Sequence, residues 1–149
     1  MESDIVYGDA ICFVLANNRL ASTVYAVLNR YIPTYPHLTK EHELSDEEAG
    51  ISFTDEAEML LYFQNRPHRD ATRYWQYAGR EPNHMLVGAY FTSDGQLIFS
   101  LTVDGDGEWE EKLLAELKEL LQSETGLLSY NYFPEFSDGA SFKQLCQSL

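Results

Sequence analysis

The sequence lacks several features that would reveal its chemistry at once. It has only two cysteines, Cys12 and Cys146, without CxxC spacing, so neither a disulfide framework nor a cysteine-ligated zinc site is expected. The apolar run nearest the N-terminus, residues 10–16, is too short to span a membrane, and no basic segment precedes it as in a signal peptide. We therefore expect a cytoplasmic protein whose thiols stay reduced.

Motifs of common enzymes are also missing. There is no GxSxG, GxGxxG, GxxxxGK[ST] or HExxH pattern. The DGDGE stretch at 104–108 resembles the start of a calcium loop, but Trp109 and Ala115 stand where that loop needs Gly and Glu. His37 and His42 are five residues apart, a spacing that places two imidazoles poorly for one metal ion. We expect no metal and no cofactor, and we assign no catalytic residue.

Basic residues are scarce. Ten Lys and Arg oppose 24 Asp and Glu, for a net charge of −14, which disfavours nucleic acid and anionic membranes as partners. Residues 41–58 hold eight acids and no Lys or Arg, and residues 104–138 hold ten acids with only two lysines. Solvated surface faces explain either segment taken alone. The two would form one acidic patch if the fold brought them to the same side.

Length and composition predict one globular domain over residues 1–149, because 149 residues with 44% hydrophobic content can bury a full core. The pattern predicts a strand over 11–16, a helix ending at Pro33, a long loop over 33–50, a short strand over 51–54, a helix over about 55–65 and a strand over 73–78. A hairpin over 85–103, a helix over 108–123 stopped by Gly126, a strand over 127–133 and a terminal helix capped by Ser137 or Asp138 follow. The fold class is α+β, a mostly antiparallel sheet with helices packed on it.

The hairpin carries a strong turn signal. Asp94-Gly95 is typical of a two-residue loop, which would pair Thr92 with Leu97 and Tyr90 with Phe99. The opposite face would then hold smaller side chains and leave room for a helix or a ligand.

The segment from Arg66 to Arg80 mixes four arginines with Tyr74, Trp75 and Tyr77. These residue types are enriched in binding sites. The arginines can also pair internally with the acidic segments, and both interpretations stay open at this point.

The stretches DEAEMLLYF, RYWQY, HMLVGAYFTSDGQLIFSLTVDG and GLLSYNYFPEF give the second two-thirds of the chain a characteristic layout. An acidic helix, an aromatic strand, an SDG hairpin, a Leu-rich helix and a final aromatic strand follow one another. This layout resembles the small acidic immunity proteins that bacteria make beside polymorphic or contact-dependent toxins. The resemblance implies a cytoplasmic non-enzyme that binds one cognate toxin tightly and blocks its active site.

Our leading hypothesis is an immunity-type inhibitor that binds a basic toxin domain, since an acidic surface speeds encounter with a cationic protein. Its candidate contact residues are the acids Glu41, Glu43, Asp46, Glu47, Glu48, Asp104, Asp106, Glu108 and Glu111, with Trp75 or Trp109 as an anchor. Of these two, Trp109 lies on the apolar stripe of its helix, which favours a core position over an anchor.

Two other classes are open. The alternative is a small-ligand-binding domain or enzyme with a pocket on the hairpin face near Arg73, Tyr74 and Tyr90. A subunit or adaptor of a larger assembly would instead expose an apolar patch.

Overall fold

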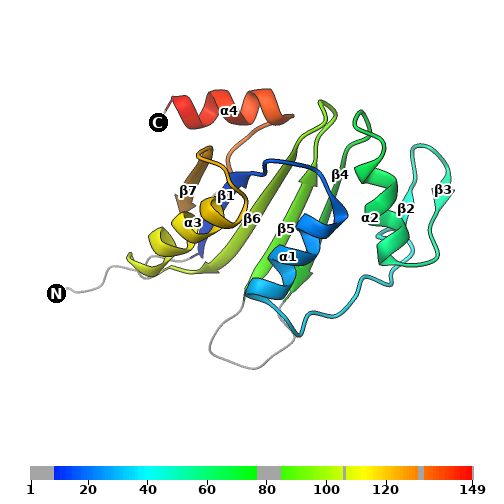
Figure 1. The fold of residues 1–149 in the computed structure, drawn as a ribbon, viewed down its shortest axis with the longest axis horizontal. Coiled ribbons are helices and arrows are strands. Elements are labelled where there is room, and N and C mark those ends of the chain that lie inside the picture. The colour runs from blue at the N-terminus through cyan, green and yellow to red at the C-terminus, as the bar shows by residue number, and fades with distance from the viewer. Residues whose placement is uncertain (1–8, 77–84, 106, 131–132, 149) are drawn as a thin grey trace.

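The computed structural model describes residues 9–76, 85–105, 107–130 and 133–148, and its centre is a five-stranded sheet (Figure 1). The strand order is β4-β5-β6-β1-β7, and all four neighbouring pairs are antiparallel. The strands are β1 (Asp9–Leu15), β4 (Ala71–Gln76), β5 (Leu86–Phe91), β6 (Leu97–Asp104) and β7 (Gly126–Tyr130). The predicted α+β class with a mostly antiparallel sheet is confirmed.

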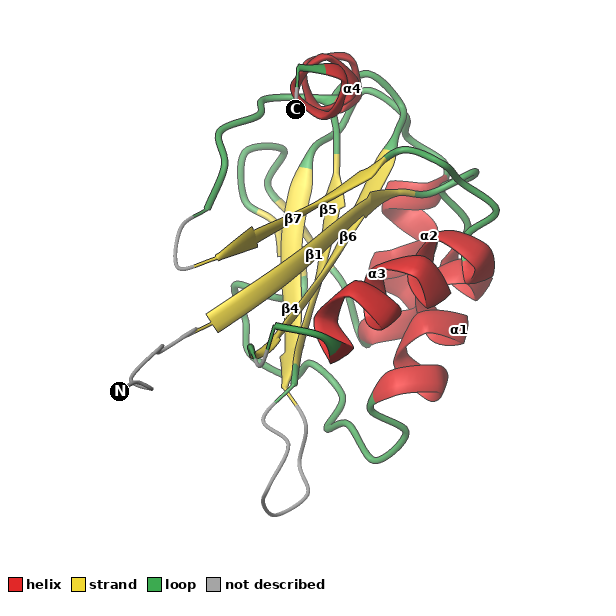
Figure 2. Cartoon of the chain, turned by 90° about the vertical axis from the view of Figure 1, so that its left-hand side faces the viewer, coloured by secondary structure: helices red, strands yellow, loops and turns green. Residues whose placement is uncertain are grey.

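Three helices cover one face of this sheet (Figure 2): α1 (Ala21–Tyr31), α2 (Glu56–Gln64) and α3 (Trp109–Leu120). The larger hydrophobic core lies between them and the sheet. The terminal helix α4 (Gly139–Gln147) lies at one end of the sheet, where Phe142 packs with Phe13, Ile98 and Leu127 of the other face. Asp138 caps α4 as predicted, and its side chain accepts a hydrogen bond from the Ser141 amide at 2.8 Å.

The predicted loop over residues 33–50 contains one short strand. β2 (Ser45–Asp46) pairs antiparallel with β3 (Ile51–Ser52) to form a separate two-stranded sheet beside α2 (Figure 1). The predicted strand at 51–54 is confirmed at its first two residues. The sequence also favours a turn over residues 79–83, which lie outside the described residues.

The predicted register of the hairpin is wrong by one residue. β5 and β6 pair Ala89 with Phe99 and Tyr90 with Ile98, so the loop has three residues between Thr92 and Gln96. Gly95 adopts a φ of 82° in this loop, as the last residue of three-residue hairpin loops commonly does. The shift moves Tyr90 to the face opposite Phe99, because a one-residue slip exchanges the two faces of a strand.

The predicted stop of α3 is also wrong. The helix ends at Leu120 and is closed by Gln122, a non-glycine residue with φ of 53°. The amide of Ser123 donates to the Lys118 carbonyl at 2.9 Å and that of Gln122 to the Glu119 carbonyl at 3.2 Å, the paired bonds of a Schellman motif. Gly126 belongs to β7, where a Cβ would lie 2.6 Å from the Phe13 carbonyl oxygen.

Candidate functional site

The two acidic segments do not form one surface. The first surrounds β2, β3 and the start of α2 at one end of the molecule, and the second follows α3 and β7 at the opposite end (Figure 1). Sheet order explains the separation, since β4 and β7 are the two edge strands and α1 lies between α2 and α3. The two acidic segments are therefore two separate candidate sites.

Asp46 is an internal anchor. Its carboxylate accepts two hydrogen bonds from Arg69, Nε to Oδ2 at 2.8 Å and Nη2 to Oδ1 at 2.7 Å. The Tyr62 hydroxyl donates to Oδ2 at 2.9 Å. The hydrogen-bonded Arg69 holds the pKa of Asp46 below its usual value, although burial acts in the other direction. Because the Asp46 side chain is only 6% exposed, its predicted role as a surface contact is corrected.

Arg73 holds the same loop from the sheet. Its Nε donates to the Glu43 carbonyl at 2.8 Å and its Nη2 to the Ser45 carbonyl at 2.7 Å. The guanidinium therefore satisfies main-chain carbonyls of the loop. The prediction that Arg73 lines a pocket together with Tyr74 is wrong. Neighbouring strand residues point to opposite faces, which separates these two side chains. The predicted internal use of the arginines is confirmed at Arg69 and Arg73.

Trp75 lies in the interior and is no surface anchor. It is 1% exposed, and its Nε1 donates to the Glu56 Oε2 atom at 2.7 Å. Glu56, itself 3% exposed, also accepts a hydrogen bond from the Leu38 amide at 2.9 Å, and its other oxygen lies 2.9 Å from His37 Nδ1. This buried carboxylate connects α2, β4 and the segment after α1.

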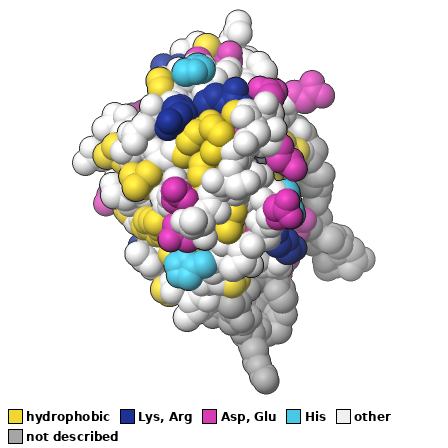
Figure 3. Space-filling model, turned by 90° about the vertical axis from the view of Figure 1, so that its right-hand side faces the viewer, with side chains coloured by type: hydrophobic (Ala, Val, Ile, Leu, Met, Phe, Trp, Pro, Cys, Tyr) yellow, Lys and Arg dark blue, Asp and Glu magenta, His cyan; other side chains and the backbone are white. Residues whose placement is uncertain are grey.

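The anchored loop presents carboxylates to solvent. Glu41, Glu47 and Glu48 are exposed and Glu43 is half-buried; we call these four residues the acidic loop surface. Ile51 of β3 and Leu61 of α2 are exposed at the same end of the molecule. Figure 3 shows this side, where acidic side chains are scattered around hydrophobic ones and a group of basic side chains lies directly against one hydrophobic patch.

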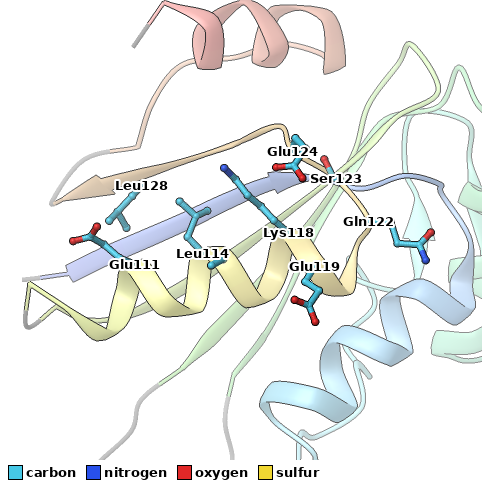
Figure 4. A pocket seen from close by; sticks show the side chains of 9 residues that line it. Glu111, Leu114, Lys118, Glu119, Gln122, Ser123, Glu124 and Leu128 are labelled. Carbon is cyan, nitrogen blue, oxygen red and sulfur yellow. The ribbon is translucent and has the colours of Figure 1, made fainter.

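The other acidic segment borders a groove between α3 and β7 (Figure 4). The groove has a volume of about 670 Å³, with Leu114 and Leu128 in its lining and Glu111 and Glu124 among its acids. Lys118 extends from α3 into the space between them. The groove therefore mixes both signs of charge.

The remaining candidates of this segment differ in exposure. Asp104 and Glu108 are exposed, and Asp106 lies outside the described residues. Glu110, in the first turn of α3, is fully buried. Its carboxylate accepts hydrogen bonds from the Tyr130 hydroxyl at 2.6 Å and the Gly107 amide at 2.8 Å. Some of the acids in this segment thus have structural roles.

Tyr74 and Tyr90 do come together on the face of the sheet that carries α4. Their hydroxyls are 2.9 Å apart, and Tyr90 reaches the Ser100 hydroxyl at 3.2 Å. Both rings line a cavity of about 490 Å³ with Phe133 and Phe136. Burial raises the pKa of Tyr90 far above its usual value, so its phenol stays protonated.

Arg19 is a residue that sequence reasoning missed. It is 7% exposed and donates five hydrogen bonds, all to main-chain carbonyls of the last turn of α2, of the segment that follows α2, and of the two residues that flank the β5–β6 loop. No signal in the sequence separates it from a surface arginine, since its five acceptors are carbonyl groups of distant segments.

No protein-family model, curated protein or solved structure matches the chain. Among the described residues, no helix is both long and apolar enough to cross a membrane. In the same part of the chain, no cluster of three or more His, Cys, Asp or Glu side chains could hold a metal ion.

Proposed function

We propose that this protein is an acidic, non-enzymatic binding protein whose acidic loop surface captures a basic protein, as an immunity protein neutralises a toxin. The observation that carries the proposal is the anchoring of the loop by Arg69 and Arg73, which leaves Glu41, Glu47 and Glu48 facing solvent. Arg69 also pairs with Glu48, its Nη1 lying 3.3 Å from Oε1, so the charge of this exposed carboxylate is partly compensated, while Glu41 and Glu47 keep their place at the surface.

Anchoring favours binding because less conformational freedom is lost on association. Arg73 fixes the main chain at Glu43 and Ser45, and the Asp46–Arg69 pair fixes the turn that follows. A partner therefore meets carboxylates that already have a defined arrangement.

Charge and apolar surface act together in this proposal. The net charge of −14 attracts a cationic partner and raises the rate of encounter, with the largest effect at low ionic strength. Exposed Ile51 and Leu61 offer the apolar contacts that interfaces place within a polar rim. An acidic loop of this kind can occupy a cleft that a nuclease-type toxin keeps for phosphate groups.

The test is affinity capture from a lysate of the source organism at low salt, followed by elution with a salt gradient. We expect to capture one basic protein in stoichiometric yield, and we expect that protein to lose its toxic activity when our acidic chain is added to it. The double variant Glu47→Lys, Glu48→Lys should release the partner at clearly lower salt.

A matched control changes the same charges at the other end of the molecule. Glu119 and Glu124 are exposed, and Glu119→Lys with Glu124→Lys alters the net charge by the same amount. Equal loss of retention in both double variants would show that only the overall charge matters and would contradict the assignment to the acidic loop surface.

A second candidate function rests on the cavity beside Tyr74 and Tyr90. It would bind a small molecule by aromatic contact with Phe133 and Phe136 and by hydrogen bonds to the tyrosine hydroxyls. A ligand screen followed by Tyr90→Phe tests it, since loss of a buried hydroxyl contact should weaken a true ligand about tenfold.

A further inference from the structure

A different cavity lies on the helical side of the sheet. It has a volume of about 480 Å³ and lies between the C-terminal end of α1, the start of β5 and the first half of α3. Arg30 and Tyr31 contribute from α1, Met85 precedes β5, and Trp109, Lys112 and Leu113 contribute from α3. Apart from Trp109, none of the candidate residues predicted for partner or ligand binding lines it.

Most of the lining is apolar or aromatic. Met85 and Leu113 are buried, at 6% and 5% exposure, while the rings of Tyr31 and Trp109 are half-buried. The Trp109 ring is held in place because its Nε1 donates to the Asp104 carbonyl at 3.2 Å. Such walls suit a flat apolar or aromatic body.

The charged groups of this cavity are mainly basic, in contrast to the chain as a whole. Arg30 and Lys112 both line it, and the one acidic residue of its lining, Glu116, already accepts a hydrogen bond from Arg30 Nη2 at 2.9 Å. The Arg30 guanidinium also lies over the Tyr31 ring, 5.1 Å from its centre, so Arg30 already forms a cation–π contact with this ring. Lys112 remains exposed at the margin to meet an anionic group.

Tyr31 adds an unused polar group. Its hydroxyl is buried and has no hydrogen-bond partner in the described part of the chain. Burial is the main reason that its pKa rises to about 12, so the group is a hydrogen-bond donor at neutral pH. Because the hydroxyl is buried, a ligand in this cavity contacts the Tyr31 ring and not its hydroxyl.

We propose that this cavity binds a small amphipathic anion, an aromatic ring system that carries one carboxylate or sulfonate group. The aromatic body lies between Tyr31 and Trp109, and the anionic group meets Lys112 and the outer side of Arg30. The site is independent of the acidic loop surface and of its proposed partner.

The experiment titrates the folded protein at low salt with 1-anilinonaphthalene-8-sulfonate, an aromatic sulfonate, and with the uncharged N-phenyl-1-naphthylamine. Fluorescence reports binding of each probe, and near-UV circular dichroism verifies that every variant is folded. We expect saturable binding of one sulfonate per chain and weaker binding of the uncharged analogue.

Two lysines of α3 provide a matched pair of variants. Lys112 lines this cavity, whereas Lys118 lines the groove beside β7. Lys112→Gln should weaken sulfonate binding about three- to fivefold and leave the uncharged probe unaffected, while Lys118→Gln should change neither by more than about twofold. Equal effects of the two variants, or sulfonate binding that never saturates, would overturn the proposal.

The aromatic wall is tested separately with Trp109→Leu. This variant should weaken both probes, because the aromatic contact is common to them. Unchanged binding of both probes in a folded Trp109→Leu protein would place the probe elsewhere and would also overturn the proposal.

Discussion

Arg19 offers the sharpest test of how this fold is held together. Its guanidinium donates to the carbonyl of Phe63 in the last turn of α2 and to those of Arg66 and Arg69 in the segment that follows. It also donates to the carbonyls of Thr92 and Gln96, which flank the β5–β6 loop. All five N–H groups of an arginine are therefore used. Arg19→Met keeps the apolar stem of the side chain and removes every one of these bonds.

The loss of stability in Arg19→Met depends on how deeply the five carbonyl acceptors are buried. The contacts to Phe63 and Thr92 are buried, and an unsatisfied buried acceptor costs about 1–3 kcal/mol. Both oxygens keep a longer bond, from the Arg66 amide at 3.4 Å and the Gly95 amide at 3.3 Å, which reduces the loss. Water can reach the three part-buried carbonyls. We expect the free energy of unfolding to fall by about 2–4 kcal/mol, and Tm by about 10 °C.

Urea unfolding followed by circular dichroism measures this change, with Arg30→Met as the matched control. Arg30 forms an ion pair with Glu116, but its side chain is 55% exposed, so its loss should cost less than about 1 kcal/mol. Arg19→Lys should recover part of the stability, since an ammonium group has three donors. The reasoning is refuted if Arg19→Met costs no more than Arg30→Met.

Three further predictions concern the backbone, a carboxylate and the thiols. Gln122→Gly should raise the free energy of unfolding by about 0.5–1 kcal/mol in urea titrations, because glycine accepts the φ of 53° without strain. Asp46→Asn should destabilise the protein most near neutral pH. The pKa of Asp46 is depressed on folding, so its contribution is present above the unfolded-state pKa of about 4 and is lost as the pH falls through the folded-state value. Urea unfolding at pH 7 and pH 3 should show the difference between Asp46→Asn and wild type shrinking with acidification. Ellman's reagent should modify one thiol per native chain, Cys146, and two in urea, because Cys12 is buried and burial raises its pKa to about 12.

The sequence predicted the elements well wherever hydrophobic periodicity was strong. The order of helices and strands agrees with the prediction except for the short strand β2, which has only two residues and no periodic pattern. The hairpin was located correctly, but its register depends on whether the loop has two or three residues. Asp94-Gly95 fits both loop lengths, so local sequence could not decide between them.

Side-chain roles within the acidic segments were harder to predict. Asp46, Glu56 and Glu110 are buried because donors from distant segments reach them, namely Arg69, Trp75 and Tyr130. No count of acids along the chain distinguishes these residues from exposed Glu47 and Glu48. The same holds for Trp75, whose position in an aromatic stretch fits an interface as well as a core.

The association rate of the captured basic partner is the measurement that tests the central claim most directly. It should be recorded by stopped flow over a range of salt concentrations for the wild type and the two double variants. We predict that Glu47→Lys with Glu48→Lys slows association about tenfold at low salt, whereas Glu119→Lys with Glu124→Lys changes it less than about threefold. Equal slowing in both variants, or no salt dependence in the wild type, would contradict the claim that the acidic loop surface receives the partner.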